Sequence, residues 1–444
     1  MGGSPVQLEV KITSPTEAFL SIPAAKVVDQ PVLDLEYSTT RLAFRVAPPQ
    51  LPPGARPRFD LTRGPDGTAR GTLVDPGGTT PVRLHLLRDG EHAGDRPQTP
   101  KPPYPYDERA AEFESKGGTR LAGTLTLPKS GGPHPAIVLI SGTGPQDRDE
   151  TLYEHRPFRV LADHLTRAGV AVLRLDDRGV GGSQGDSTTA TEDDKAADAL
   201  AAMAWLSTQP GIDAKRIGLL GHSEGGVLAA MAASRANEPS AAFVVLFASP
   251  GVPASDLLRT QMRLKLEAAG ATKDQLDISM KAQNDAIDAV LRDASDADLE
   301  RIVTAQIDGL LAKLPEEERK RVSPAEREGR IKAGLAQITA PSMKAFIKST
   351  PSTYLEKLTC PVLAIGGTKD LQVPATENLA AIDAALKKAG NRDVTTQSFD
   401  GLNHLFQRAD LGTMEEWATI DETLDPRVLE ALTGWLTSRT GLVK

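Results

Sequence analysis

Cysteine is nearly absent from this chain of 444 residues, which contains only Cys360. One cysteine excludes an internal disulfide and any metal cluster that is built on several thiolates. Because Cys360 directly precedes the apolar run from Pro361 to Ile365, we interpret it as a small structural thiol. The sequence also lacks the His-x-x-x-His and paired-carboxylate patterns that are typical of metal sites. We therefore expect neither a metal nor another cofactor.

An excess of basic residues and a long apolar run are also missing. The chain has 51 Lys and Arg against 59 Asp and Glu, a net charge of −8. Because nucleic-acid binding requires clustered Lys and Arg, this balance argues against a nucleic-acid partner. No apolar run approaches the ~18 residues that a membrane-spanning helix needs. We expect no membrane span and a small-molecule substrate, and the oligomeric state stays open.

The first residues give little information about the location of the protein. Met1-Gly2-Gly3-Ser4 is followed by neither the basic segment nor the apolar core of a signal peptide. We expect an exported protein, periplasmic or secreted, whose signal segment is not part of this sequence. A cytoplasmic protein is the alternative.

The N-terminal part of the chain has the pattern of a small β domain. Apolar and polar residues alternate in short stretches between Val6 and Leu87, and turn clusters such as Pro65-Asp66-Gly67 separate several of them. From Asp89 to Tyr106 the chain is rich in proline and charge, which is typical of a stiff linker. We predict an antiparallel β domain, a sheet or partial barrel, with its linker over residues 1–106.

The rest of the chain predicts an α/β fold. After a strand that we expect to be antiparallel, at 119–127, apolar strands alternate with helices, which is typical of a mostly parallel sheet with helical crossovers. Residues 253–348 interrupt this pattern with charged, helix-like sequence that is too long for a loop. We predict a catalytic domain over residues 107–252 and 349–444, with a helical lid at 253–348 inserted between two strands.

The motif Gly221-His222-Ser223-Glu224-Gly225 lies where a predicted strand turns directly into a predicted helix. Such a turn puts the central residue in a strained backbone conformation and exposes its side chain. Small residues at the first and last positions let the strand and helix approach closely. The pattern predicts a nucleophilic Ser223, with the amide of Glu224 directed at a developing oxyanion.

A serine nucleophile needs a base and an acid that orients the base. Asp370 follows a predicted strand, and His404 lies in the loop after the last one. The chain order serine, aspartate, histidine is that of the α/β-hydrolases. Asp176 and Asp400 remain alternatives for the acid.

The chain resembles bacterial serine esterases of the α/β-hydrolase superfamily, in the branch near dienelactone hydrolases and acyl-peptidases. The resemblance covers roughly Arg120 to the C-terminus, and a weaker one links the β domain to domains that precede the hydrolase domain in some of these esterases. It is carried by the stretches around Asp370 and His404 and by the segments 141–149 (Ser-Gly-Thr-Gly-Pro-Gln-Asp-Arg-Asp), 177–183 (Asp-Arg-Gly-Val-Gly-Gly-Ser) and 221–226 (Gly-His-Ser-Glu-Gly-Gly).

The resemblance implies a role for each matching residue. Ser223 is the expected nucleophile, His404 the general base and Asp370 its orienting acid. The loop around Gly142 supplies a second backbone oxyanion donor, with the amide of Thr143 as the main candidate. Many relatives carry His-Gly where this chain has Ser141-Gly142, a change that keeps the backbone donor.

These roles imply a serine carboxylic-ester hydrolase that acts through an acyl-enzyme on small to medium acyl esters. A peptidase, thioesterase or acyltransferase with the same triad is the alternative, and a binding protein on a hydrolase fold is a third hypothesis. Asp147, Arg148 and Asp149 either bind the leaving group or brace their loop by ion pairs. His155 is expected at the surface or at the mouth of the pocket.

Overall fold

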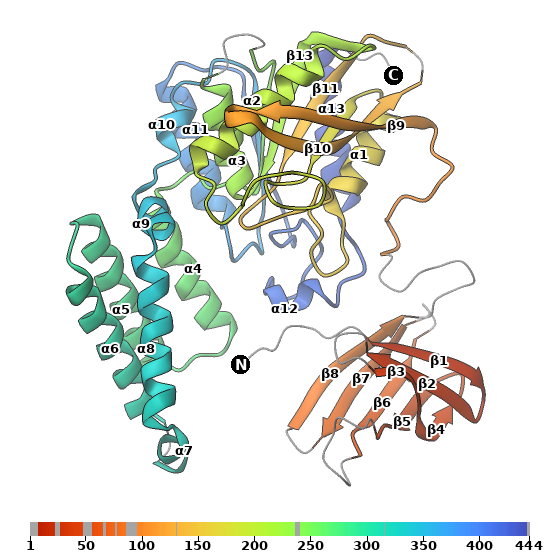
Figure 1. The fold of residues 1–444 in the computed structure, drawn as a ribbon, viewed down its shortest axis with the longest axis vertical. Coiled ribbons are helices and arrows are strands. Elements are labelled where there is room, and N and C mark those ends of the chain that lie inside the picture. Colours follow the sequence, from red (N-terminus) through yellow and green to blue (C-terminus); the bar gives the residue numbers. More distant parts are fainter. Residues whose placement is uncertain are drawn as a thin grey trace. The chain divides into compact units, whose positions relative to one another are not determined.

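The computed structural model describes residues 8–22, 27–47, 56–64, 68–75, 78–85, 96–129, 131–235, 240–314 and 316–441. The chain divides into two compact units, Met1–Asp95 and Arg96–Lys444 (Figure 1). The sequence predicts a β domain and its linker over residues 1–106. Arg96 and Gln98 of the predicted linker lie in the second unit, where they donate hydrogen bonds to backbone carbonyls, for example those of Tyr153 and Leu424.

The first unit consists of two antiparallel sheets. β1 (Glu9–Ser14), β2 (Glu17–Ile22) and β3 (Val27–Pro31) form one of them. The other sheet has the order β4 (Leu33–Tyr37), β5 (Arg41–Arg45), β6 (Arg58–Arg63), β7 (Thr68–Asp75) and β8 (Gly78–His85). Leu20 of the first sheet shares an apolar core with Phe44 and Phe59 of the second. A small antiparallel N-terminal domain is thus confirmed.

The second unit is built on a mixed sheet with the strand order β16-β15-β14-β13-β11-β12-β10-β9. β9 and β10 run antiparallel to their neighbours, and the other pairs are parallel. The antiparallel strand predicted at 119–127 is β10, whereas β9 was not predicted. The bounds are β9 Tyr106–Ser115, β10 Thr119–Pro128, β11 His134–Ile140, β12 Ala171–Leu175, β13 Ile212–His222, β14 Val244–Phe247, β15 Val362–Gly367 and β16 Val394–Phe399.

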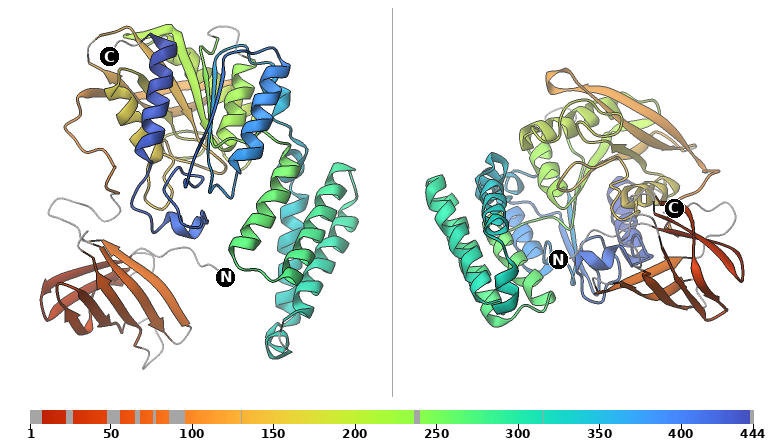
Figure 2. Two further views of the ribbon diagram at one scale, coloured as in Figure 1. Left: turned by 180° about the vertical axis from the view of Figure 1, so that it is seen from behind. Right: turned by 60° about the horizontal axis from the view of Figure 1, so that its bottom comes forward.

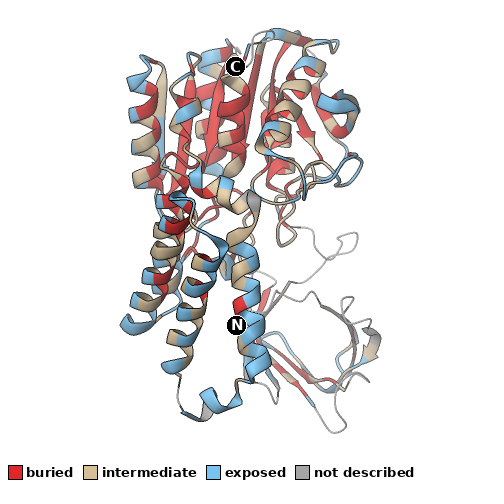
Figure 3. Ribbon diagram, turned by 60° about the vertical axis from the view of Figure 1, so that its left-hand side comes forward, coloured by how far each residue is buried: buried red, intermediate tan, exposed pale blue. Residues whose placement is uncertain are grey.

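Helices cover both faces of this sheet (Figures 1 and 2). One face packs against α2 (Glu192–Ser207), α3 (Glu224–Ala233), α10 (Ser352–Leu355) and α11 (Ala375–Lys388), and the other against α1 (Pro157–Arg167) and α13 (Pro426–Thr440). Central strands that are apolar on both faces are typical of parallel sheets under two helical layers. Figure 3 shows burial concentrated in these strands. The predicted α/β architecture is confirmed.

Most of the sequence between β14 and β15 forms a separate set of helices, as expected for residues 253–348. These are α4 (Ala254–Ala268), α5 (Lys273–Leu291), α6 (Asp296–Ala312), α7 (Glu316–Arg321), α8 (Pro324–Thr339) and α9 (Pro341–Lys348). Ile287, Val290 and Leu299 are buried in an apolar cluster of their own. Within the described part of the chain, no helix combines the length and apolar character that crossing a bilayer requires.

Candidate active site

Ser223 lies at a sharp turn between β13 and α3. Its φ of 54° and ψ of −123° fall in a region that a residue with a side chain rarely adopts. The flanking glycines explain how the turn closes. A Cβ on Gly221 would lie 1.9 Å from the carbonyl oxygen of Gly225, and a Cβ on Gly225 would lie 2.2 Å from that of Ile140. The strand and helix therefore approach as closely as the motif predicts.

Asp370 and His404 form a buried hydrogen-bonded pair at the same edge of the sheet. Nδ1 of His404 lies 2.7 Å from Oδ2 of Asp370. The other carboxylate oxygen accepts from the amides of Gln372 and Val373, at 2.7 and 2.8 Å, which fixes the carboxylate in place. Since Nδ1 is engaged, Nε2 is the ring nitrogen of His404 that can take a proton.

The ring of His222 connects this pair to the serine turn. The centroids of the His222 and His404 rings are 4.8 Å apart, and His222 directly precedes Ser223. Among the described residues no hydrogen bond joins Ser223 Oγ to His404. Catalytic hydrogen bonds are often long in a free enzyme and shorten when substrate binds.

The two alternative acids are engaged elsewhere. Asp176 accepts hydrogen bonds from Arg148 and from the amide of Gly182. Asp400 accepts from the hydroxyl of Thr368 at 3.1 Å. Of the three candidate carboxylates, Asp370 is therefore the one that contacts the imidazole of His404.

The loop after β11 lies directly against Ser223. A Cβ on Gly142 would lie 3.3 Å from the Cβ of Ser223. The amide of Gly142 donates to Oε1 of Glu150 at 2.7 Å, so it is not available to an oxyanion while this bond is in place. The amides of Thr143 and of Glu224, the first residue of α3, remain the predicted donors. Ser141 donates to Asp177 at 2.8 Å, which holds the start of the loop.

Glu150 and His222 form a second buried acid–histidine pair that the sequence did not predict. Oε1 of Glu150 lies 2.9 Å from Nδ1 of His222, and the two side chains are 2% and 5% exposed. Burial lowers the pKa of His222, but the charge and hydrogen bond of the Glu150 carboxylate outweigh it, and the net pKa is raised.

Trp417 of α12 (Met414–Trp417) lies over the imidazole of His404. The two rings are stacked, with centroids 6.2 Å apart. The carbonyl oxygen of Trp417 lies 3.0 Å from Nε2 of His155, whose Nδ1 lies 2.9 Å from the hydroxyl of Thr423. The expectation of an exposed His155 was wrong, because this side chain is fully buried and holds the segment that covers the base.

Burial of His155 predicts a loss of stability in mild acid. Burial is the main reason why its pKa is lowered to about 4. An unfolded histidine titrates near ~6.5, so between that pH and about 4 only the unfolded chain gains the proton. This contribution to the free energy of unfolding is complete above pH ~6.5 and falls by at most ~1.4 kcal/mol per pH unit as the pH drops. Denaturant unfolding from pH 7.5 to 4.5 should show a shallower decline for His155→Gln than for the wild type. An equal decline in the free energy of unfolding of the two proteins would contradict the lowered pKa of His155.

The charged residues after the loop brace the structure. Arg148 binds Asp176, as described above, and Asp149 is paired with the buried Arg174 of β12. Asp147 accepts from the hydroxyl of Thr151 at 2.7 Å. Of the two predicted roles for these three residues, the observed contacts favour bracing.

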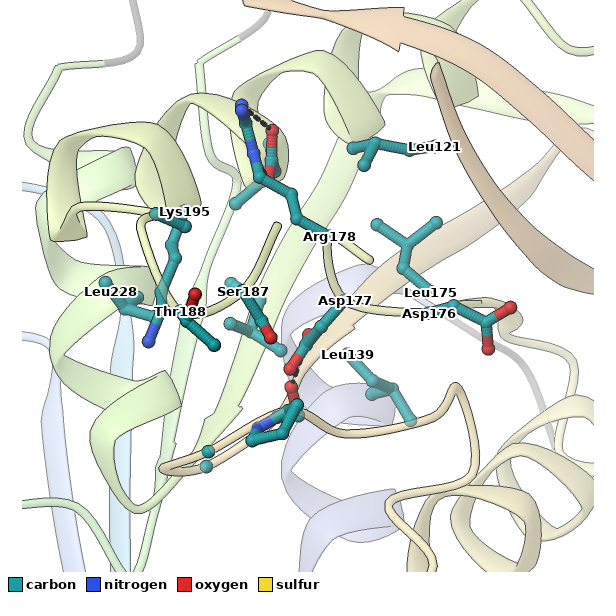
Figure 4. Close-up of a pocket in the computed structure, with 18 residues that line it drawn as sticks. Leu121, Leu139, Leu175, Asp176, Asp177, Arg178, Ser187, Thr188, Lys195 and Leu228 are labelled. Carbon is teal, nitrogen blue, oxygen red and sulfur yellow. Dashed lines mark hydrogen bonds and ion pairs between the residues drawn. The ribbon is translucent and has the colours of Figure 1, made fainter. Parts of the chain in front are cut away.

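A cavity of about 140 Å³ lies beside the loop after β11 (Figure 4). Leu121, Leu139 and Leu175 lie on one side of it, and Lys195 and Leu228 on the other. The remaining lining residues are Ile140, Ser141, Gly142, Gly144, Pro145, Asp176, Asp177, Arg178, Ser187, Thr188, Ala190, Asp198 and Ala199.

Two ionisable groups of this cavity are linked to the active-site loops. Lys195 Nζ lies 3.0 Å from Oε1 of Glu224, the residue after the predicted nucleophile. Asp177 accepts from Ser141, and its burial raises the pKa of its carboxyl to about 6, although hydrogen bonds from Gln146 and Ser141 oppose the rise. The cavity thus combines apolar lining residues with charged groups that contact the active-site loops.

Comparison with known proteins places the chain in a family. The family model of the X-Pro dipeptidyl-peptidases (S15 family) matches residues 117–398, more than half of the chain. The chain belongs to the S15 family. The matched region of this S15-family protein contains Ser223 and Asp370 and ends just before His404.

This S15-family protein is also similar to other bacterial proteins. It is 27% identical to esterase EstD of Thermotoga maritima over 329 residues, which cover 73% of this chain and 68% of the relative. It is 36% identical to an uncharacterised protein of Mycobacterium tuberculosis over 122 residues, 27% of this chain and 39% of the relative.

Solved structures that are similar to this chain include an esterase from Pyrococcus furiosus. Its TM-score is 0.46 at 16% identity, and the match covers 76% of this chain and 92% of that one. The α/β hydrolase GrgF from Penicillium also has a TM-score of 0.46, with 17% identity and coverage of 76% and 99%.

The resemblance to serine esterases of the α/β-hydrolase superfamily is confirmed, and the protein is a hydrolase.

Proposed function

We propose that this protein is a serine carboxylic-ester hydrolase that works through an acyl-enzyme. The observation that carries the proposal is the buried pair of Asp370 and His404, at 2.7 Å, next to the strained turn of Ser223. The carboxylate holds the imidazole with Nδ1 engaged and stabilises its protonated form. Nε2 of His404 takes the proton of the Ser223 hydroxyl as Oγ attacks the ester carbonyl.

The tetrahedral intermediate carries a negative charge on the former carbonyl oxygen. The amide of Glu224 at the start of α3 and the amide of Thr143 donate to this oxygen, and the positive end of the helix dipole of α3 adds to the stabilisation. His404 then gives its proton to the leaving alcohol. Water attacks the acyl-enzyme by the same steps and releases the acid.

The helical insertion would form one wall of the substrate site. Gln261 of α4 donates to the carbonyl oxygen of Gln372, two residues after Asp370, at 2.5 Å. The pKa of Lys265, one turn further along α4, is lowered by burial, while the charge of Asp370 acts in the opposite direction. These contacts support a lid role, since α4 reaches the loop that carries the acid.

The cavity beside the loop after β11 supports small to medium acyl groups. Leu121, Leu139 and Leu228 contribute apolar surface to its lining, it offers about 140 Å³ of space, and Gly142 lines it while lying against Ser223. An acyl chain of a few carbons that occupied this cavity would lie beside the loop of Gly142 and Gly144, and its apolar carbons would gain free energy on burial.

A substrate panel tests the proposal. p-Nitrophenyl esters of increasing acyl length, a thioester and a peptide p-nitroanilide are compared by kcat/KM. We expect ester hydrolysis, with highest values for short and medium acyl chains and a fall for long ones. Faster turnover of the peptide or the thioester would contradict an ester hydrolase, and no turnover of any substrate would favour a binding protein.

A dipeptidyl-peptidase is the second candidate, because the matched family model is that of the X-Pro dipeptidyl-peptidases. The same triad can attack an amide, and His404 then protonates the leaving amine as it protonates the leaving alcohol of an ester. An X-Pro p-nitroanilide in the panel tests this directly. A kcat/KM for it above those of the esters would favour the peptidase.

A further inference from the structure

A continuous chain of hydrogen bonds runs from the loop after β11 to the loop of His404. The amide of Gly142 donates to Oε1 of Glu150 at 2.7 Å, and this oxygen lies 2.9 Å from Nδ1 of His222. Nε2 of His222 lies 3.1 Å from the carbonyl oxygen of His404. The proposed mechanism uses neither Glu150 nor His222 in a chemical step.

The hydrogen-bonding atoms determine where protons lie in this chain. A carbonyl oxygen can only accept, so Nε2 of His222 must carry a hydrogen toward His404. One further proton lies between Nδ1 of His222 and Oε1 of Glu150, either on nitrogen as an imidazolium–carboxylate pair or on oxygen as a neutral pair. In both forms every link is satisfied and the pair has no net charge.

The Glu150–His222 pair requires an unfavourable backbone conformation and the burial of two polar side chains. Glu150 has a φ of 52°, a left-handed conformation that is unfavourable for a residue with a side chain. Its side chain and that of His222 are almost completely buried, where unpaired polar groups are costly. The hydrogen bonds to the amide of Gly142 and to the carbonyl oxygen of His404 satisfy these buried groups and restrain the backbone at Gly142 and at His404.

We propose that Glu150 and His222 are positioning residues. They hold the predicted oxyanion loop and the loop of His404 in fixed positions relative to Ser223. The inference rests on the proposed function. Through Gly142, Glu150 fixes the backbone directly before Thr143, and through the carbonyl of His404, His222 fixes the backbone that carries the imidazole. Since His222 directly precedes Ser223, the same hydrogen-bonded chain connects the nucleophile, the oxyanion loop and the loop of His404.

Glu150→Gln breaks this chain with almost no change in shape. The amide oxygen of glutamine can accept from Gly142 but has no proton to give to Nδ1 of His222. With its NH₂ group turned toward Nδ1, it would instead place a donor against the Gly142 amide. His222→Phe keeps a ring of similar size but removes both links. One bond is lost in the first variant and two in the second.

The test compares these variants with Asp163→Asn and His164→Phe, which make the same chemical changes on α1. Asp163 accepts from Tyr106 and Arg167, and His164 contacts Thr433. For each protein, kcat and KM are measured with a p-nitrophenyl ester, and sites are counted by fluorophosphonate titration. Melting temperatures are measured alongside.

We expect Glu150→Gln and His222→Phe to lower kcat per titrated site about ten- to a hundredfold with little change in KM, since small misplacements of reacting groups cost this much. The double variant should be no worse than the poorer single variant, because the links act in series. The α1 variants should keep wild-type kcat.

A kcat per site equal to that of the α1 variants would overturn the proposal, even if the melting temperature falls. Failure of both variants to fold would assign the pair to stability and would overturn it as well. Loss of activity in Ser223→Ala, measured first, establishes the proposed function independently, so the two hypotheses can fail separately.

Discussion

Replacing Ser223 by alanine is expected to lower kcat for a p-nitrophenyl ester by a factor on the order of 10⁴ to 10⁶. The substitution removes the hydroxyl that forms the acyl-enzyme and leaves the oxyanion donors and the substrate site in place. KM should therefore change much less than kcat. Steady-state kinetics with the purified variant checks this result.

Ser249→Ala is the matched control for this prediction. Ser249 is buried beside the same turn, where a Cβ on Gly226 would lie 2.3 Å from its Oγ. It follows β14 and has no place in the proposed mechanism, so its variant should keep wild-type kcat. Full turnover by Ser223→Ala would show that another group is the nucleophile.

Asp370→Asn should have the second-largest effect, a loss of kcat of about 10⁴-fold. An asparagine keeps the shape of the side chain but cannot stabilise the imidazolium of His404, and it can hold the imidazole in the wrong tautomer. The amides of Gln372 and Val373 can still donate to its oxygen, so we expect the fold to persist. Circular dichroism and kcat of the same preparation check both statements.

Asp400→Asn gives the comparison that distinguishes the two acids. Asp400 was an alternative on sequence grounds, and its carboxylate accepts from Thr368 in the structure. Its variant should retain most of the wild-type kcat. A large loss in Asp400→Asn together with an unchanged Asp370→Asn would move the orienting acid to residue 400.

The sequence predicts the strand and helix pattern of the hydrolase unit well because its signals are local. Apolar stretches such as Ala136–Ile140 are buried strands, and the helix expected from Asp193 to Leu206 is α2. The residues Ser223, Asp370 and His404 could be singled out because each follows a strand, and parallel strands end at one edge of the sheet. That Asp370 and His404 contact each other is a finding of the structure.

Other features depend on contacts between distant residues and leave no local pattern. β9 has a mixed sequence, Tyr-Asp-Glu-Arg-Ala-Ala-Glu-Phe-Glu-Ser, and its strand conformation follows from its pairing with β10. His155 is buried only because the segment around Trp417 returns to it more than 250 residues later. A histidine near the start of a helix gives no sign of such burial.

The Glu150–His222 pair illustrates the same limit within the active site. Glu150 follows the loop that the resemblance singles out, and His222 lies inside the serine motif, yet nothing in their spacing indicates a contact across 72 positions. Only the fold brings β11 and β13 together as neighbours and so places the two loops side by side. The two local signals for this contact are a glutamate near the oxyanion loop and a histidine directly before the nucleophile.

Covalent labelling is the most direct test of the central claim that Ser223, activated by His404 and Asp370, attacks the substrate. The protein is treated with a fluorophosphonate, and the adduct is located by mass spectrometry of peptides from the wild type and from Ser223→Ala and His404→Ala. We predict one adduct, on Ser223, which is absent in Ser223→Ala and forms far more slowly in His404→Ala. An adduct at another residue, or ester turnover without any adduct at Ser223, would contradict the mechanism.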